Sequence, residues 1–416
     1  MLSHDEVLTP RTAFPRSFAA TAGSNAACMA VASYLFLAWF PALSPVALVT
    51  LAVCLASVFL LGHFSTGTGD GRLNAFLIVF LAASGVSAML GGSPQRSLAG
   101  SMPMIPAMAV FMLVAYRFEG RRQVLQALSA LIFAAFVASL GLLVNAADAG
   151  LSSDPRMLVQ SLGFSQFVVP NDVAVLAILS PFPIAVALSS SANRALRIAC
   201  LAIVVTFACA VVAVQSRLGT LLFLLSGVVT VVATRERGKN HAARGMALLA
   251  CALVIPAIAV DAWLGWPLLH KTAHVLDTRF SLWEVAFQML VERPILGHGP
   301  NTFGLAWDVH LSQAGAPSAA PGMERTPWCH SLLLEIAAER GLVGLGALLG
   351  VLGRIGYLIF RRLDLRDPVL AVPLALSFVL FSLAALFELT LLRQWVVTLL
   401  FLYAGMVSVI SRTDRK

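Results

Sequence analysis

The chain has 416 residues, of which 59% are hydrophobic and only 12% are charged, and its formal net charge is +8 at pH 7. This composition excludes an ordinary soluble protein of two or three domains, because a mean hydropathy of +0.87 describes a chain whose solvent is lipid. The sequence predicts a single polytopic membrane domain over residues 1–416, with the lipid bilayer as its first partner.

Apolar runs of about 20 residues recur along the chain, and this is the length that crosses a hydrocarbon core of roughly 30 Å. Each run is expected to be helical, because lipid offers no partner to an unpaired backbone N–H or C=O group. We therefore predict an all-α integral membrane protein with about 12 transmembrane helices. Their expected ranges are 24–41, 43–62, 73–90, 101–116, 124–145, 171–189, 197–215, 218–234, 245–264, 341–360, 368–387 and 394–411.

The orientation of these helices follows from the basic residues. Residues 1–23 give no secretory signal, since they are charged and lack an apolar stretch before the first expected span. With both termini in the cytoplasm, 19 of the 28 lysines and arginines lie on the cytoplasmic side, as the positive-inside rule requires. Topology thus accounts for most of the basic excess, and no nucleic-acid partner is indicated.

A long polar segment over residues 265–341 separates the ninth and tenth expected spans. It is external in this orientation, or periplasmic in a Gram-negative cell, and it holds five of the chain's eight histidines. Long loops of this kind are usually functional or disordered, and the content of Trp, Gly and Pro favours an ordered, partly helical loop. We expect part of the active site here, on or beside helices over Ser281–Glu292 and Trp328–Arg340.

The first of these loop helices has the spacing of a capping box at Ser281–Glu284, and Pro294 is expected to end it. This places Arg279 at its N-terminal end. Aromatic and aliphatic residues recur at helical intervals, which predicts an amphipathic helix lying on the membrane surface. This stripe consists of Phe280, Trp283, Phe287 and Leu290.

The second loop helix is expected to begin at Thr326 and Pro327, a favourable N-cap and N1 pair. His330 would then lie in the first turn, where free N–H groups and the helix dipole favour an anion. A neutral imidazole there could act as a base, although a lone histidine is more often structural.

Other polar residues of the loop leave two interpretations open. His270 and His274 have the i, i+4 spacing of two metal ligands, with Asp277 as the only further candidate, or they form a solvated face. We predict neither a metal nor another cofactor. Cys329 is the one cysteine in the loop, so no disulfide is expected.

Two further arginines lie at the external edge of the membrane. Arg217 stands between two spans with almost no loop, where it is either functional or extends to the lipid headgroups. Arg393 and Glu388 bracket the last external turn and could pair with each other, or Arg393 could join the external basic cluster. Three arginines and a histidine at this surface suit a substrate with a phosphate head and a lipid tail.

From about Arg156 to Arg393 the sequence resembles the O-antigen ligase and O-antigen polymerase superfamily of bacterial polysaccharide assembly. The matching motifs are Pro170-Asn171-Asp172, Ser216-Arg217, Arg279-Phe280-Ser281-Leu282-Trp283, Arg293-Pro294-Ile295-Leu296-Gly297-His298-Gly299, His330-Ser331-Leu332-Leu333-Leu334-Glu335 and Glu339-Arg340-Gly341-Leu342-Val343-Gly344-Leu345. Two positions depart from the family pattern, because Ser331 stands where members often have Asn and Leu218 separates Arg217 from a small residue. Neither departure removes a charge.

The resemblance implies a metal-independent glycosyltransferase on the outer face of the bacterial inner membrane, with a glycan on undecaprenyl diphosphate as donor. Arg217 and Arg279 would hold the diphosphate, and His330 would activate the acceptor hydroxyl or orient the reacting centre. Asn171 and Arg393 are expected to help bind the substrate.

The acceptor separates three activities that share these motifs. We place ligation of O-antigen to lipid A-core first, and polymerisation onto a growing glycan second, with transfer to protein also open. A secondary transporter is a different class, but transporters tend to place their charges near the midplane rather than at the external edge. A structural membrane scaffold is less favoured than either.

Overall fold

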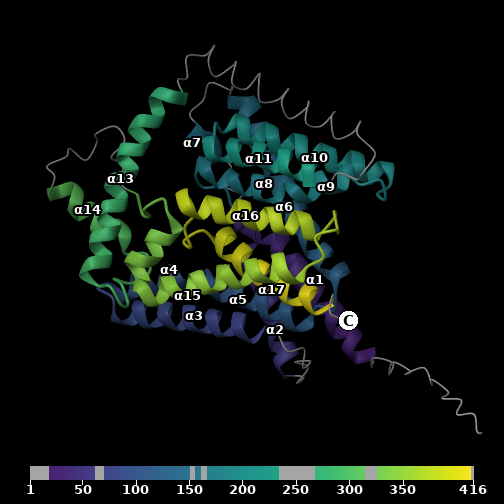
Figure 1. Cartoon of the computed structure of the whole chain (residues 1–416), viewed down its shortest axis with the longest axis horizontal. Coiled ribbons are helices and arrows are strands. Elements are labelled where there is room, and N and C mark those ends of the chain that lie inside the picture. Colours follow the sequence, from purple (N-terminus) through teal and green to yellow (C-terminus); the bar gives the residue numbers. More distant parts are fainter. Residues whose placement is uncertain are drawn as a thin grey trace, which may run out of the picture.

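The structure, a computed structural model, describes residues 18–60, 70–149, 155–160, 166–233, 268–313 and 326–413. Every regular element in these ranges is helical, as predicted (Figure 1). The helices are α1 (Phe18–Leu37), η1 (Pro41–Leu43), α2 (Ser44–Leu60), α3 (Gly71–Leu90), α4 (Pro94–Ser101), α5 (Met104–Arg117), α6 (Arg121–Ala149), α7 (Pro155–Gln160), η2 (Pro170–Val173), α8 (Ala174–Leu179), α9 (Pro181–Leu188), α10 (Arg194–Ala213), α11 (Arg217–Ala233), α13 (Leu268–Glu292), α14 (Phe303–Gln313), α15 (Leu332–Arg362), α16 (Ala371–Phe387) and α17 (Gln394–Thr413).

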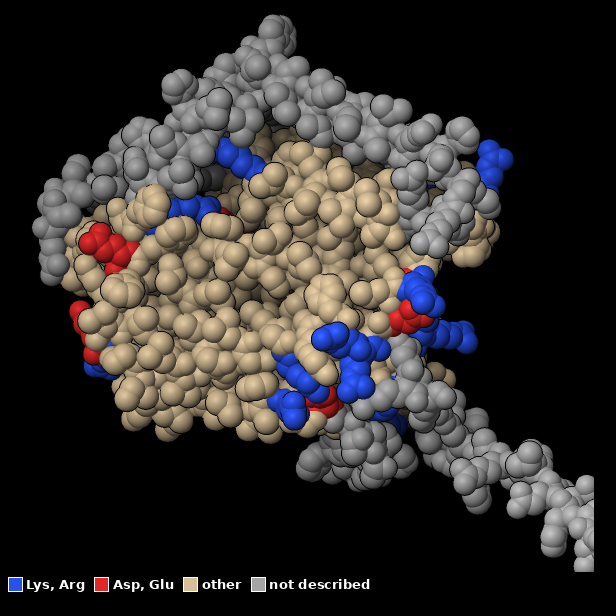
Figure 2. Space-filling model, in the orientation of Figure 1, with Lys and Arg blue, Asp and Glu red and all other residues tan. Residues whose placement is uncertain are grey.

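The chain is a multi-pass membrane protein. Seven helical segments of the described residues are long and apolar enough to cross a membrane, and four shorter apolar helices accompany them. These segments correspond to eleven of the twelve predicted spans, and the remaining prediction, 245–264, lies outside the described residues. In Figure 2 the charged residues leave a broad uncharged band across the middle of this face, as expected of a surface that contacts lipid tails.

Helix α17 forms the centre of the bundle. Of the most apolar 18-residue stretch of α17, 94% is buried inside the protein. Only 22% of the corresponding stretch of α10 is buried, and α10 directs side chains such as Ile198 and Val212 outward. Helix α17 packs against α5 and α15, and α15 runs beside α3 (Figure 1). The most buried helix therefore carries at its N-terminal end the turn that holds Glu388 and Arg393.

Polar contacts of the predicted cytoplasmic segments gather at one end of the bundle, where α1 begins and α17 ends (Figure 1). These contacts are Arg354 with Asp70 at 2.5 Å, Arg121 with Asp367 at 2.5 Å, and Arg412 with the carbonyl of Phe118 at 2.9 Å. Helices α13 and α14 lie at the opposite end. The two sets of loops are thus separated as the sequence predicted, and which end faces the cytoplasm stays a prediction.

The prediction of a capping box that starts a helix at Ser281 is wrong, because α13 begins earlier in the chain. It runs without interruption through Ser281, so Arg279 lies inside the helix and not at its N-terminal end. The S-x-x-E spacing is equally compatible with a helix interior, and apolar residues on one face, including Leu282, Val285 and Met289, pack into a small core against α14 and α15. The helix ends at Glu292, just before Pro294, as predicted.

The predicted start of the second loop helix is wrong. The predicted helix over Trp328–Arg340 and the predicted span over 341–360 are one kinked helix that begins only at Leu332. His330 has φ +56° and Ser331 is extended, so neither can belong to a helical turn. His330 therefore precedes the helix, and Thr326 and Pro327 do not cap it.

The kink of α15 lies at Gly341, which has φ 64° and ψ −170°, a combination open essentially to glycine alone. Backbone groups that the kink frees from the helix pair with the loop over residues 294–299. The carbonyls of Ala338 and Glu339 accept from the N–H groups of His298 (3.1 Å) and Gly299 (2.8 Å), and the N–H groups of Leu342 and Val343 donate to the carbonyls of Pro294 (2.7 Å) and Ile295 (3.3 Å). The glycine-rich loop is therefore a structural support for α15.

Candidate active site

Glu388 is the residue on which the predicted site residues converge. It follows the last residue of α16, and its side chain is only 4% exposed. One carboxylate oxygen, Oε1, accepts from Nδ1 of His330 at 2.9 Å, and the other, Oε2, accepts from the Arg279 guanidinium at 2.6 Å. Arg279 also donates to the backbone carbonyl of Phe387. Two residues from the polar segment are thus fixed against the turn between α16 and α17.

The charge of Glu388 is maintained by these partners. Burial by itself would raise the pKa of the Glu388 carboxyl, but the charge and hydrogen bond of His330 and the charge of Arg279 outweigh that effect and lower it below the ordinary value. A hydrogen bond from the side chain of Asn171 acts in the same direction. Glu388 is therefore ionised near neutral pH.

Asn171 connects this carboxylate to the start of α11. Its Oδ1 accepts from Oγ of Ser216 at 3.3 Å, and a carboxylate can only accept, so its amide N–H₂ faces Glu388. Ser216 in turn accepts from the N–H of Gly219 at 3.2 Å and caps α11, whose first residue is Arg217. The side chain of Arg217 is half-buried and makes no hydrogen bond or ion pair with any described residue.

Arg393 belongs to a second ion pair beside the first. Its Nε lies 3.5 Å from Oδ1 of Asp172, and its guanidinium lies over the ring of Trp328 at 4.7 Å. Asp172 is held by the N–H groups of Val168 and Val169 and by the indole of Trp395. Arg393 therefore pairs with Asp172, and the predicted alternative of a pair with Glu388 is replaced by the pairs of Glu388 with Arg279 and His330.

His330 lies between these two ion pairs. Its ring is 5.6 Å from the ring of Trp328, its side chain is 23% exposed, and its Nε2 has no hydrogen-bond partner among the described residues. Among the residues that the structure describes, three non-glycine residues have positive φ, and two of them, Gln215 and His330, flank the site. Such backbone strain persists where the surrounding structure holds the residue in place, and it is common at active sites.

The structure thus brings His330, Arg279, Asn171 and Arg393 together and places Arg217 next to them through Ser216. Sequence reasoning missed Glu388 as a site residue. One signal could have found it: a carboxylate at the membrane edge, directly after an apolar run, needs a partner. The buried Glu339 and Arg340 pair with each other at 3.4 Å, and Glu339 accepts from backbone N–H groups at the start of α14, so both are structural.

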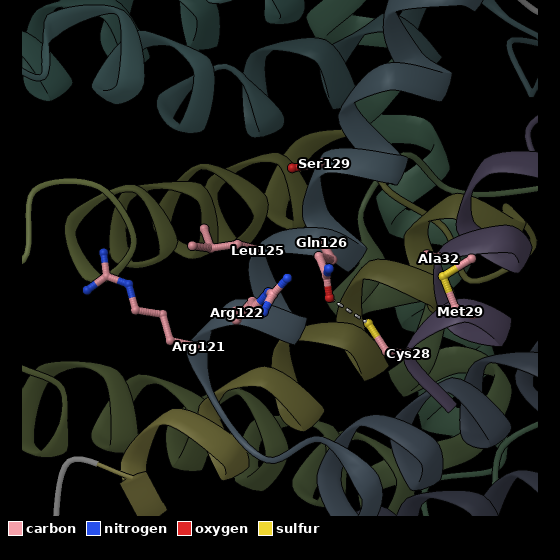
Figure 3. Close-up of a pocket in the computed structure, with 8 residues that line it drawn as sticks. All are labelled: Cys28, Met29, Ala32, Arg121, Arg122, Leu125, Gln126 and Ser129. Atoms are coloured by element: carbon pink, nitrogen blue, oxygen red, sulfur yellow. Dashed lines mark hydrogen bonds between the residues drawn. The ribbon is translucent and has the colours of Figure 1, made fainter. Parts of the chain in front are cut away.

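Other features of the described residues do not add to this site. No group of three or more His, Cys, Asp or Glu side chains among them could hold a metal ion, and the side chains of His270, His274 and Asp277 lie outside the described part of the chain. An open pocket of about 730 Å³ lies between α1 and α6, lined by residues such as Cys28, Arg122 and Gln126 (Figure 3). It contains none of the predicted site residues.

Comparison with known proteins adds one finding. Residues 202–349 match the family model described as O-antigen ligase. The match includes Arg217, Arg279 and His330, while Asn171, Glu388 and Arg393 lie outside it. No curated protein matches the chain significantly.

Proposed function

Because the chain carries an O-antigen ligase family domain over residues 202–349, we propose that it transfers a glycan from an undecaprenyl-diphosphate donor to an acceptor hydroxyl. The acceptor is lipid A-core, and the reaction takes place at the periplasmic face of the bacterial inner membrane. The single observation that supports this best is the cluster of His330, Arg279 and Glu388 at one end of the bundle.

The base of the reaction is Nε2 of His330. It takes the proton of the acceptor hydroxyl while the hydroxyl oxygen forms a bond to the anomeric carbon of the donor sugar. The bond between that carbon and the diphosphate oxygen breaks, and undecaprenyl diphosphate leaves with the electron pair. The exposed part of the His330 side chain leaves the ring accessible to an acceptor.

Arginines stabilise the negative charge that develops on the leaving diphosphate. Arg217 is the cation best suited to bind it, since it is half-buried and has no described partner to displace. Arg279 and Arg393 already balance Glu388 and Asp172, and they contribute through guanidinium N–H groups that their carboxylates leave unused. Asn171 completes the proposed substrate-binding set.

The apolar surface beside the site suits the lipid tail of such a donor. Phe280, Phe287 and Val291 on α13 are 60%, 59% and 63% exposed, and they lie on the side of the helix away from its packed core. A chain of isoprene units can lie against these side chains while its diphosphate reaches Arg279 on the same helix.

The main alternative is polymerisation of O-antigen or exopolysaccharide repeat units, in which a growing glycan replaces lipid A-core as acceptor. A secondary transporter is less well supported, because the turn between α16 and α17, which carries Glu388 and Arg393, lies at the end of these helices and not near their middle. Deletion of the gene followed by gel analysis of surface glycans separates these functions. Core lipid without O-chain, with accumulated lipid-linked polymer, indicates a ligase. Core carrying one repeat indicates a polymerase, and unchanged surface glycan contradicts both.

A reconstituted assay tests the chemistry directly. Purified protein, undecaprenyl-diphosphate-linked glycan and lipid A-core in the presence of EDTA should yield glycosylated core, because the proposed chemistry is assigned to His330 and arginines and needs no metal ion. Absence of product with EDTA, and its appearance when Mg²⁺ or Mn²⁺ is added, would contradict the metal-independent mechanism.

A further inference from the structure

We propose that Glu388 is a positioning residue for glycan transfer, which holds the His330 ring in the tautomer whose Nε2 can accept a proton and sets Arg279 beside it. The inference rests on the proposed function. It starts from the position of Glu388, which is almost fully buried and uses both carboxylate oxygens on two site residues, at 2.9 Å to His330 and 2.6 Å to Arg279.

The hydrogen bond to His330 determines which ring nitrogen can accept a proton. An ionised carboxylate can only accept, so Nδ1 of His330 carries the hydrogen and donates it to Oε1 of Glu388. In the neutral ring the free lone pair is then on Nε2, the nitrogen without a described partner. When Nε2 takes the acceptor's proton, the ring becomes positive, and the carboxylate at 2.9 Å stabilises it without itself being protonated.

The second oxygen of Glu388 fixes the position of Arg279. Arg279 lies inside α13, and its guanidinium reaches the turn after α16 through Glu388 and the carbonyl of Phe387. These two hydrogen bonds, one to a carboxylate oxygen and one to a backbone carbonyl, order a long side chain that would otherwise be mobile. The same carboxylate also neutralises much of the Arg279 charge, so Glu388 is expected to orient Arg279 and to weaken its attraction for a diphosphate.

Glu388 also reaches the start of α11, through the side chain of Asn171 and the cap formed by Ser216. Three segments that are far apart in the sequence therefore meet at one carboxylate. Its loss should disorder the catalytic geometry, including Arg279, while leaving in place Arg217, the cation best suited to bind the donor.

The test compares Glu388→Gln, which keeps the shape of the side chain and removes its charge, with Glu388→Asp, which keeps the charge. Glu292→Gln is a matched control, because it removes a carboxylate that lies 3.4 Å from another imidazole, that of His298. The turnover of Glu388→Gln should fall about 100-fold or more, the range of general-base effects, while donor binding weakens less than about threefold. Glu388→Asp should recover part of the loss, and Glu292→Gln should behave as the wild type.

A double mutant shows whether Glu388 acts through His330. In a His330→Ala background, Glu388→Gln should reduce turnover by no more than about a further twofold, since residues that act as a unit are not additive. Independent losses that multiply would overturn the inference, as would near-wild-type turnover in Glu388→Gln. Equal losses of turnover and donor binding, together with a lower melting temperature, would make Glu388 a purely structural residue.

A spectroscopic measurement does not depend on the reaction. In protein labelled with ¹⁵N-histidine, the His330 signal is identified by its absence in His330→Ala, and it should report an Nδ1–H tautomer that is lost in Glu388→Gln. The same tautomer in both proteins would overturn the inference. Wild-type protein that transfers no glycan would instead refute the proposed function, so the two failures are distinguishable.

Discussion

Gly299 and Glu339 are joined by a backbone hydrogen bond of 2.8 Å, in which the N–H of the loop glycine donates to a carbonyl that the kink of α15 leaves free. The carboxylate of the same Glu339 accepts the N–H of Phe303 at 3.2 Å and so anchors the start of α14. One residue thereby ties the loop, the kinked helix and the next helix together. This arrangement holds the N-terminal end of α15, and with it His330, in a fixed place.

Gly341 is expected to be indispensable for this arrangement. A Cβ at Gly341 would overlap the backbone of Ile295, and its φ of +64° is unfavourable for any other residue. Gly341→Ala should therefore destabilise the protein by about 2 kcal/mol or more and reduce the yield of folded protein. Thermal unfolding in detergent measures the effect, with Gly346→Ala on the same helix as the control, because a Cβ there meets open space. Equal melting temperatures would contradict the structural role of the kink.

The membrane helices could be predicted from sequence because length and apolar composition are local properties. The two helix starts in the polar segment could not, because distant contacts decide them. His330 is held outside the helix by Glu388, 58 residues away, and Arg279 inside α13 binds the same carboxylate, 109 residues away. Glu388 itself was missed as a site residue since its partners come from three separate segments.

The orientation in the membrane can be tested at two described positions. Ser312 on α14 is exposed at the end of the bundle predicted to be periplasmic, and Arg366 is exposed at the other end. In a cysteine-free background, Ser312→Cys should react in intact cells with a thiol reagent that cannot cross the inner membrane, and Arg366→Cys should react only after lysis. The opposite pattern would reverse the predicted orientation.

The stability of the protein should decrease in acid through Glu388. The pKa of the Glu388 carboxyl is lower in the folded protein than in the unfolded chain. Its contribution to the free energy of unfolding is therefore complete at pH values above the pKa of the unfolded chain, and it is lost as the pH falls through the pKa of the folded protein. We expect the melting temperatures of wild type and Glu388→Gln to differ most near neutrality and to converge as the pH falls below about 4.5, the ordinary value of the carboxyl. A constant difference across this range would show that Glu388 is not ionised in the folded protein.

Arg217 and Arg279 should differ in how they affect the reaction. Arg217→Ala should weaken donor binding and transfer about 100-fold, because an unpaired guanidinium is lost, and Lys should restore only part of this as a point charge. Arg279→Ala should reduce transfer more than donor binding, since its charge is shared with Glu388. Binding and turnover with a lipid-linked glycan measure both effects. Arg361→Ala, at the other end of α15, is the charge-matched control, and a loss of donor binding in this variant would point to a nonspecific charge effect.

His330 gives the most direct test of the proposed chemistry. If Nε2 takes the acceptor's proton, His330→Ala should lose turnover about 100-fold or more and keep most of its donor affinity. The transfer rate of the wild type should fall in acid, because a protonated ring cannot accept a proton, and the residual rate of the variant should lack this dependence. Transfer and donor binding measured across pH separate a base from a residue that only orients the diphosphate, since the latter would lose both together. Near-wild-type transfer in a well-folded His330→Ala would make His330 structural and leave catalysis to the arginines.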